Sequence, residues 1–335
     1  MKKFLPGLLL TALLASISTI LAGLIPKNLI SASVIALLLG MLLNPILSKH
    51  TLFQGGIHQA SKQVLRLGII LMGLTLSFEQ VISVGSYSLL VMVFTLITAF
   101  GSGYLLGRLF HMNWKLSSLI SAGTGICGGS AIAAIAPTIG AENKDIAYAI
   151  AATFLFDVLM VILFPIAGRF FGMSDLGYGL WTGTAVNDTS SVVAAGYAFS
   201  DAAGAFSVIV KLTRTLTIVP AVLIFSFINA RVISKETGKK AATPKVRIKK
   251  VFPGFILIFL CMVAIKSIGI VPEFITKNIS GIAKFLMVMA LGAIGLKTNY
   301  KEMFSSGAKP MLHGLIISTL VVVVSFAVQL FLGQV

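Results

Sequence analysis

Apolar segments long enough to cross a lipid bilayer recur along the whole of this 335-residue chain. A transmembrane helix needs about 20 consecutive, mainly apolar residues. Hydrophobic residues make up 57% of the sequence and charged residues 11%, which excludes an ordinary water-soluble domain. A transmembrane β-barrel would instead show ~10-residue segments of alternating polarity, and the sequence has none. The sequence therefore predicts an all-α polytopic membrane protein.

About nine apolar segments are predicted to cross the membrane completely. They cover residues 4–25, 29–47, 64–78, 88–110, 146–170, 204–230, 252–270, 282–296 and 311–332. The first of them follows Met1-Lys2-Lys3, as in a secretory signal, but it is long for a signal core and further spans follow it. We interpret it as a transmembrane helix, and residues 1–335 as a single transmembrane domain.

Two further segments, 116–141 and 176–200, are interrupted at their centres by glycine-rich or polar sequence. The interruptions are Thr124-Gly-Ile-Cys-Gly-Gly-Ser130 and Thr184-Ala-Val-Asn-Asp-Thr-Ser-Ser191. Lipid offers no partner for a free backbone N–H or C=O, so such sequence is tolerated at membrane depth only inside protein or beside a wet cavity. In secondary transporters, interrupted helices mark the substrate site. The alternative is that the small residues serve close helix packing.

Each interruption is expected to start a half-helix, one from Gly128-Gly129 and one near Ser191, where the polar run supplies its own cap. A helix start exposes unpaired N–H groups and the positive end of the helix dipole, which suits an anion. We expect backbone N–H groups and the hydroxyls of Thr124 and Ser130 to act as donors. The predicted substrate-binding residues are Thr124, Gly125, Cys127, Gly128, Gly129, Ser130, Thr184, Asn187, Thr189, Ser190 and Ser191.

Four charged residues within the apolar spans are candidates for ion coupling or charge balance. A carboxylate near the bilayer centre must be paired, protonated or bound to a cation, so Asp188 is predicted to couple transport to a proton or sodium. The alternative is a fixed ion pair between Asp188 and Lys211 or Arg214. Those two cations either balance charge in the site or extend towards the interface. Asp157 is either functional or hydrogen-bonded to a neighbouring helix.

The formal net charge of +16 is concentrated in loops, most clearly at residues 231–250. The positive-inside rule makes this segment cytoplasmic, with the amino terminus inside and the carboxyl terminus outside. No aromatic residues interleave with these charges, so nucleic-acid binding is not expected. If both interrupted segments cross fully they run in the same direction, whereas two re-entrant hairpins would enter from opposite faces. The charges between them do not decide this.

The sequence contains two weak internal repeats, and the first agrees with the predicted orientation of the spans. An offset of 222 positions places Gly73-Leu74 on Gly295-Leu296, in segments predicted to run in opposite directions. An offset of 60 places Gly123-Thr124 on Gly183-Thr184. The first match indicates an inverted-repeat transporter architecture.

No motif indicates an enzyme or a metal site. The sequence has neither His-Glu-x-x-His nor Gly-x-Ser-x-Gly. Its two cysteines, Cys127 and Cys261, are far apart and lack metal-ligand spacing. We expect no cofactor, no metal and no enzymatic activity.

Three stretches, Gly123–Ile132, the Phe156-Asp157 pair leading to Phe164-Pro165, and Gly183–Ser191, together with Leu291–Leu296, resemble the YeiH family. Its members are bacterial inner-membrane proteins commonly labelled sulfate exporters. The family is similar to the cation/proton antiporters and anion transporters. The resemblance implies core and scaffold domains, an elevator movement and a homodimer. By the same analogy, Asn187-Asp188 looks like the Asn-Asp pair that binds the coupling cation in some antiporters.

The sequence therefore predicts a secondary active transporter that exports a small anion, such as sulfate or an organosulfonate-derived anion, coupled to a proton or sodium. A cation/proton antiporter without anion transport and a passive anion channel are the alternatives. Imposed proton or sodium gradients would distinguish them, because a channel follows only the gradient of its own anion.

Overall fold

The computed structural model describes residues 4–24, 31–47, 50–237, 253–298 and 307–334, and all regular structure within these ranges is helical. The all-helical prediction is confirmed for these residues. Among the described residues, six helical segments are long and apolar enough to span a membrane. They are α1 (Leu5–Leu24), α5 (Phe78–Leu109), α8 (Asn143–Phe170), the Asp201–Lys235 stretch of α11 and α12, α15 (Glu273–Lys297) and α17 (Ala308–Phe331). Shorter apolar helices are α2 (Ala32–Leu47), α7 (Gly129–Ile139) and α14 (Phe255–Ser267).

Some helices extend beyond the apolar segments because their ends are polar. α5 begins at Phe78 rather than near residue 88, behind a capping box in which Ser77 Oγ accepts from Gln80 N–H at 3.2 Å. A continuous helical rod replaces the span expected at 64–78. It consists of α3 (Thr51–Gln59), the π-helical η2 (Ala60–Val64) and α4 (Leu65–Met72), followed by the short 3-10 turn η3 (Gly73–Thr75). Of the predicted basic loop 231–250, residues 238–250 lie outside the described residues.

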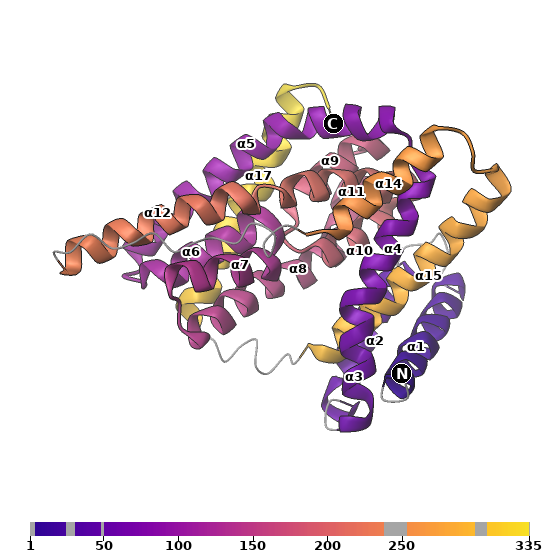
Figure 1. Ribbon diagram of the computed structural model, residues 1–335, viewed down its shortest axis with the longest axis horizontal. Coiled ribbons are helices and arrows are strands. Elements are labelled where there is room, and N and C mark those ends of the chain that lie inside the picture. Colours follow the sequence, from indigo (N-terminus) through magenta and orange to yellow (C-terminus); the bar gives the residue numbers. More distant parts are fainter. Residues whose placement is uncertain (1–3, 25–30, 48–49, 238–252, 299–306, 335) are drawn as a thin grey trace.

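The helices form two groups (Figure 1). In the first, which we call the α15 bundle, α1, α2, α3 and α4 pack around α15, and α14 packs against α4 and η3. The backbones of α2 and α15 approach closely, since a β-carbon on Gly40 would lie 2.8 Å from the Leu296 nitrogen. Asn44 Nδ2 also donates to the Leu296 carbonyl at 2.6 Å. Small residues permit such close packing.

The second group, the hairpin bundle, contains α5 to α12 and α17. Its remaining elements are α6 (Trp114–Ala122), the π-helical η4 (Gly123–Cys127), α9 (Asp175–Ala185), α10 (Thr189–Phe199), α11 (Asp201–Thr215) and α12 (Ile218–Thr237). An apolar cluster joins the two bundles, with Ile69 of α4 and Met287 of α15 on one side and Val193 of α10 and Val208 of α11 on the other.

The segment from α6 through η4 to α7 folds back on itself as a helical hairpin. Lys115 Nζ, at the start of α6, donates to the Gly140 carbonyl just after α7 at 2.8 Å. Midway along the two arms, a β-carbon on Gly123 would meet the Ile132 side chain at 2.9 Å. The two ends of this segment therefore lie together, and its turn falls at Cys127-Gly128.

The segment α9–α10 forms a second hairpin. Ser200 Oγ, after α10, donates to Asp175 Oδ1 at the start of α9 at 2.6 Å. The Tyr178 and Phe199 rings stack with their centroids 4.0 Å apart, and Tyr178 OH donates to the Ala195 carbonyl at 3.0 Å. The turn of this hairpin is the extended stretch at residues 186–188.

Candidate functional site

The tips of the two hairpins meet, and a lysine from α11 joins them. Lys211 is fully buried, and its Nζ donates to the carbonyls of Ile126 in the first tip and Val186 in the second, each at 2.9 Å. Both carbonyls belong to the ends of interrupted helices, where the helix dipole is negative. The ammonium group thus neutralises two helix ends at once.

Arg214 lies one turn further along α11 and is also fully buried. Its Nε donates to the Gly125 carbonyl at 2.6 Å and its Nη2 to the Thr124 carbonyl at 2.5 Å. A longer bond of 3.4 Å joins Nη1 to the Val186 carbonyl. Since a guanidinium group presents several donors in one plane, Arg214 satisfies the carbonyls that the π-helical turn leaves without intrahelical partners.

Asp157 of α8 contacts the second hairpin tip where α10 begins. This is the positive end of the α10 dipole, whereas Lys211 contacts the negative end of α9. Asp157 Oδ1 accepts from Asn187 N–H at 2.9 Å and its Oδ2 from Asp188 N–H at 3.1 Å. Two backbone donors stabilise a buried carboxylate. Of the two readings of Asp157 from the sequence, hydrogen bonding to a neighbouring segment is the one that these contacts show directly.

Asp188 is the N-cap of α10 and accepts from both the N–H and the hydroxyl of Ser190, the N–H at 2.9 Å. α10 thus begins at Thr189, close to the expected start near Ser191. Among the described residues, ion pairs within 4.0 Å join Lys144 to Glu142 and Lys284 to Asp201, and none includes Asp188. The fixed ion pair considered for Asp188 is therefore not formed in this structure.

The start of α7 differs from the start of α10. α7 begins at Gly129, as the sequence predicts, and within the described part of the chain no side chain caps it. Its N-cap residue is Gly128, and the next hydroxyl, that of Ser130, belongs to an exposed residue. Helix starts carry unpaired N–H groups. This helix start is therefore open to a ligand, whereas protein carboxylates already occupy the start of α10.

A central cavity of about 870 Å³ lies between the two bundles and reaches both helix starts. On the side of the hairpin bundle it contacts the hydroxyl-bearing residues Ser130, Thr189 and Ser190, and the carboxylates Asp157 and Asp188. Three exposed cations, Lys62, Arg66 and Lys297, line the part contributed by the α15 bundle. The cavity therefore has a basic wall and a polar, acidic wall.

Six of the predicted site residues line this cavity, and the other nine lie behind it. Those that line it are Gly129, Ser130, Asp157, Asp188, Thr189 and Ser190. Those behind it are Thr124, Gly125, Cys127, Gly128, Thr184, Asn187, Ser191, Lys211 and Arg214, all of them buried. The buried residues shape and connect the tips.

The hydroxyls of two predicted substrate-binding residues, Thr124 and Thr184, face α17 instead of the cavity. Thr124 Oγ1 lies 3.4 Å from Ser318 Oγ, and Thr184 Oγ1 lies 2.6 Å from Ser325 Oγ. Asn187 Nδ2 also donates to Ser318 Oγ, at 3.3 Å. These serines were not predicted from the sequence, although their spacing of seven residues indicates that both lie on one face of a helix.

The site offers little to a transition metal. In the described residues no group of three or more His, Cys, Asp or Glu side chains is arranged to hold one. Cys127 is buried in the first tip and Cys261 is exposed on α14.

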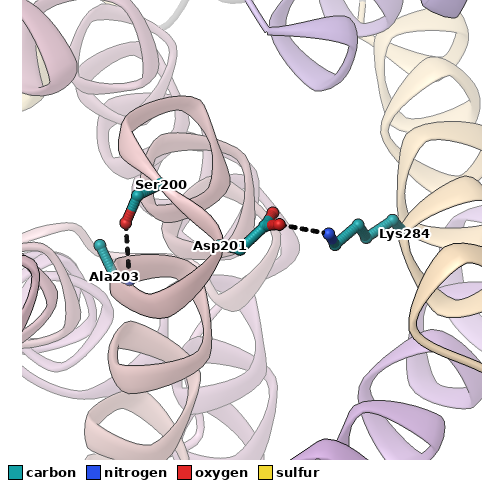
Figure 2. A network of polar contacts seen from close by, with 4 residues as sticks. All are labelled: Ser200, Asp201, Ala203 and Lys284. Carbon is teal, nitrogen blue, oxygen red and sulfur yellow. Dashed lines mark hydrogen bonds and ion pairs between the residues drawn. The ribbon is translucent and has the colours of Figure 1, made fainter. Parts of the chain in front are cut away.

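An ion pair joins the two bundles beside the open ends of the second hairpin. Lys284 Nζ of α15 lies 2.6 Å from Asp201 Oδ2 at the start of α11 (Figure 2). Ser200 caps the same helix start, with its Oγ accepting from Ala203 N–H at 3.0 Å. Both charged side chains are partly exposed, at 37% for Lys284 and 74% for Asp201, so the pair contributes at most about 1 kcal/mol.

These features define a multi-pass helical membrane protein with a polar cavity at the meeting point of two interrupted helices. The chain belongs to the UPF0324 family, which is the YeiH family indicated by its sequence motifs. The family model "Conserved hypothetical protein 698" matches residues 6–333. The chain is 67% identical to a UPF0324 membrane protein of Clostridium tetani, over 100% of this chain and 99% of that protein. It is 37% identical to one of Streptococcus agalactiae (99% and 98% covered) and 36% identical to one of Fusobacterium nucleatum (99% of each).

Proposed function

We propose that this protein is a secondary transporter that binds a small anion, such as sulfate or an organosulfonate-derived anion, at the start of α7. The observation that carries the proposal is the uncapped helix start at Gly129-Ser130, which opens into the central cavity at the point where the hairpin tips meet. Helix N-termini bind oxyanions through backbone N–H groups. The basic wall formed by Lys62, Arg66 and Lys297 would draw an anion into the cavity.

The charges around the tips supply a reason for coupling. Lys211 and Arg214 formally balance Asp157 and Asp188, so an anion arriving there would add uncompensated charge. Protonation of one carboxylate leaves an excess positive charge, and the anion and the proton then favour each other's binding. We therefore propose that Asp188, the partly buried carboxylate that lines the cavity, carries the coupling proton.

A proton is favoured over sodium by the contacts of the helix ends. In transporters with broken helices, sodium binds to unwound backbone carbonyls. Here the carbonyls of Thr124, Gly125, Ile126 and Val186 accept hydrogen bonds from Lys211 and Arg214. These tethered cations occupy positions that sodium would otherwise use.

The proposal includes a bacterial inner-membrane location, with the amino terminus in the cytoplasm and the hairpins entering from opposite faces. This orientation is supported by the positive-inside rule, because Lys62 and Lys297 line the same cavity as Pro137 of α7 and Gly254. Gly254 follows the basic segment 231–250 in the sequence. An elevator movement between the bundles, a homodimer and the export direction rest on the resemblance, and an inverted repeat rests on the internal sequence match at an offset of 222 positions. Export would require an outward anion gradient that exceeds the inward proton gradient.

Proteoliposomes loaded with buffer test the proposal directly. An imposed proton gradient should drive accumulation of labelled sulfate above its equilibrium level, and dissipation of the gradient with a protonophore should abolish this. Uptake that follows only the sulfate gradient would identify a channel.

A cation/proton antiporter is the second candidate, because Asp157 and Asp188 line the cavity while Lys211 and Arg214 lie behind it. Sodium-dependent proton movement in liposomes that contain no transportable anion would favour this function.

A further inference from the structure

We propose that a crevice between α5, α6 and α12 binds an anionic phospholipid, with one acyl chain inside the crevice and the phosphate at Arg108. The crevice is separate from the central cavity and has a volume of about 760 Å³. Pockets of roughly 300–1,000 Å³ are large enough for small-molecule ligands. This proposal does not depend on the transport function.

The shape and lining of the crevice suit an acyl chain. Apolar side chains such as Leu96, Phe100, Ile224 and Ile228 form most of its wall. Between Leu96 and Arg108 it follows α5 for about 18 Å at 1.5 Å per residue, which exceeds half of the ~30 Å hydrocarbon core. An acyl chain of one leaflet therefore fits along it.

The surface around the crevice is apolar and exposed. Ile97, Leu105 and Leu109 of α5 are each more than 60% exposed, as expected for side chains that face lipid. Acyl chains of the bilayer therefore reach the opening of the crevice directly.

One end of the crevice carries the groups that bind a phosphate at the membrane interface. Arg108 lines it, and its Nη1 donates to Tyr104 OH at 3.2 Å while its guanidinium lies 5.7 Å from the centre of the Tyr104 ring. Trp114, a residue type typical of membrane interfaces, lines the same end. No described Asp or Glu side chain lies within 4.0 Å of Arg108, so the donors that remain are available to a phosphodiester.

The deep end of the crevice reaches the first hairpin. Ile126, whose carbonyl accepts from Lys211, lines it together with Ser121 of α6. A bound acyl chain would therefore pack against the outer side of the hairpin tip and stabilise it. This contact distinguishes a specific lipid from the general lipid shell around the protein.

Native mass spectrometry of the full chain in neutral detergent tests the proposal with phosphatidylglycerol and phosphatidylcholine of identical acyl chains. The wild type should retain phosphatidylglycerol in clear preference to phosphatidylcholine. Arg108→Gln should weaken phosphatidylglycerol retention roughly five- to tenfold, because it removes a charge-assisted contact. Lys277→Gln, which removes one exposed charge from α15, should retain it like the wild type.

Two further measurements keep the test independent of any single variant. Phosphatidylglycerol with a photoreactive acyl chain should crosslink to the crevice residues of α5 and α12, and Ile228→Trp, which fills the crevice, should reduce this crosslinking. Glycerol phosphate, the headgroup without chains, should neither bind detectably nor compete. Equal retention of the two lipids by the wild type, unchanged retention by Arg108→Gln, or crosslinks spread evenly over the lipid-facing helices would each overturn the proposal.

Discussion

Gly128 lies directly against Asp188, so that a β-carbon at position 128 would come within 2.9 Å of both Cβ and Oδ1 of Asp188. This contact is where the two hairpin tips touch. Gly128 also has φ of +64° and ψ of −134°, a conformation that residues with a β-carbon rarely adopt. The approach of the tips and the backbone conformation thus both require glycine at this position.

Gly128→Ala is therefore expected to disrupt the site, whereas Gly129→Ala is its matched control. Alanine at 128 brings both backbone strain and a clash, at a cost of about 2 kcal/mol or more. At position 129, no described atom lies within 4 Å of an added β-carbon. Apparent melting temperatures in detergent should fall clearly for Gly128→Ala and stay near the wild type for Gly129→Ala. Equal melting temperatures would show that the tips do not meet as described.

A larger side chain at Gly129 tests anion binding instead of folding. Since this residue lines the central cavity at the start of α7, Gly129→Leu should leave the melting temperature near that of Gly129→Ala but abolish anion uptake. Retained uptake by a folded Gly129→Leu protein would exclude this helix start as the anion site.

The two predicted hydroxyl donors, Ser130 and Thr124, differ in what they face, so they are expected to differ in their effect on anion binding. The Ser130 residue is exposed in the cavity, whereas the Thr124 hydroxyl faces Ser318. Loss of a hydrogen bond to a charged ligand should lower the anion affinity of Ser130→Ala about tenfold. Thr124→Val should stay within about twofold of the wild type, because its carbonyl still accepts from Arg214. Isothermal titration with the transported anion measures both, and the reverse order of effects would contradict the placement.

The sequence predicted the position of both interruptions but not whether each interrupted segment crosses the membrane or folds back as a hairpin. Glycines and clustered polar residues weaken helices locally, so the breaks at Gly128 and Asp188 follow from residue type. Whether each segment crosses or folds back depends on contacts such as Lys115 with Gly140, which bring together residues far apart in sequence. For the same reason, the sequence could not decide whether Lys211 extends towards the interface or balances charge in the site. Its ammonium group reaches carbonyls 85 and 25 positions away.

Lys211 should matter far more for stability than Lys284, although both contact oxygen atoms at short distance. Lys211→Met leaves the buried Ile126 carbonyl without its donor, at roughly 1–3 kcal/mol. The Val186 carbonyl keeps only the longer 3.4 Å contact from Arg214 Nη1. Lys284→Met removes an exposed ion pair with Asp201, worth at most about 1 kcal/mol. Thermal melts of the two variants should therefore show a large and a small loss of stability. Similar losses would mean that Lys211 does not join the hairpin tips.

Asp188→Asn separates the capping role of Asp188 from its charge. Asparagine is as good an N-cap as aspartate, so α10 should still start at Thr189 and the protein should remain folded. If the Asp188 carboxylate carries the coupling proton, its loss should remove the pH dependence of anion binding. A proton gradient should then no longer drive accumulation, while exchange of anion across the membrane continues. Asp188→Ala, which also loses the cap, serves as the comparison. Proton-driven accumulation by Asp188→Asn would assign coupling to another group.

A crystal structure with selenate, an oxyanion with a strong anomalous signal, shows directly whether an anion binds at the start of α7. We expect an anomalous peak within hydrogen-bonding distance of the backbone N–H groups at Gly129 and Ser130, beside the point where Gly128 meets Asp188. Hairpin tips that lie apart, or an anion bound elsewhere while this helix start stays empty, would contradict the proposed anion site.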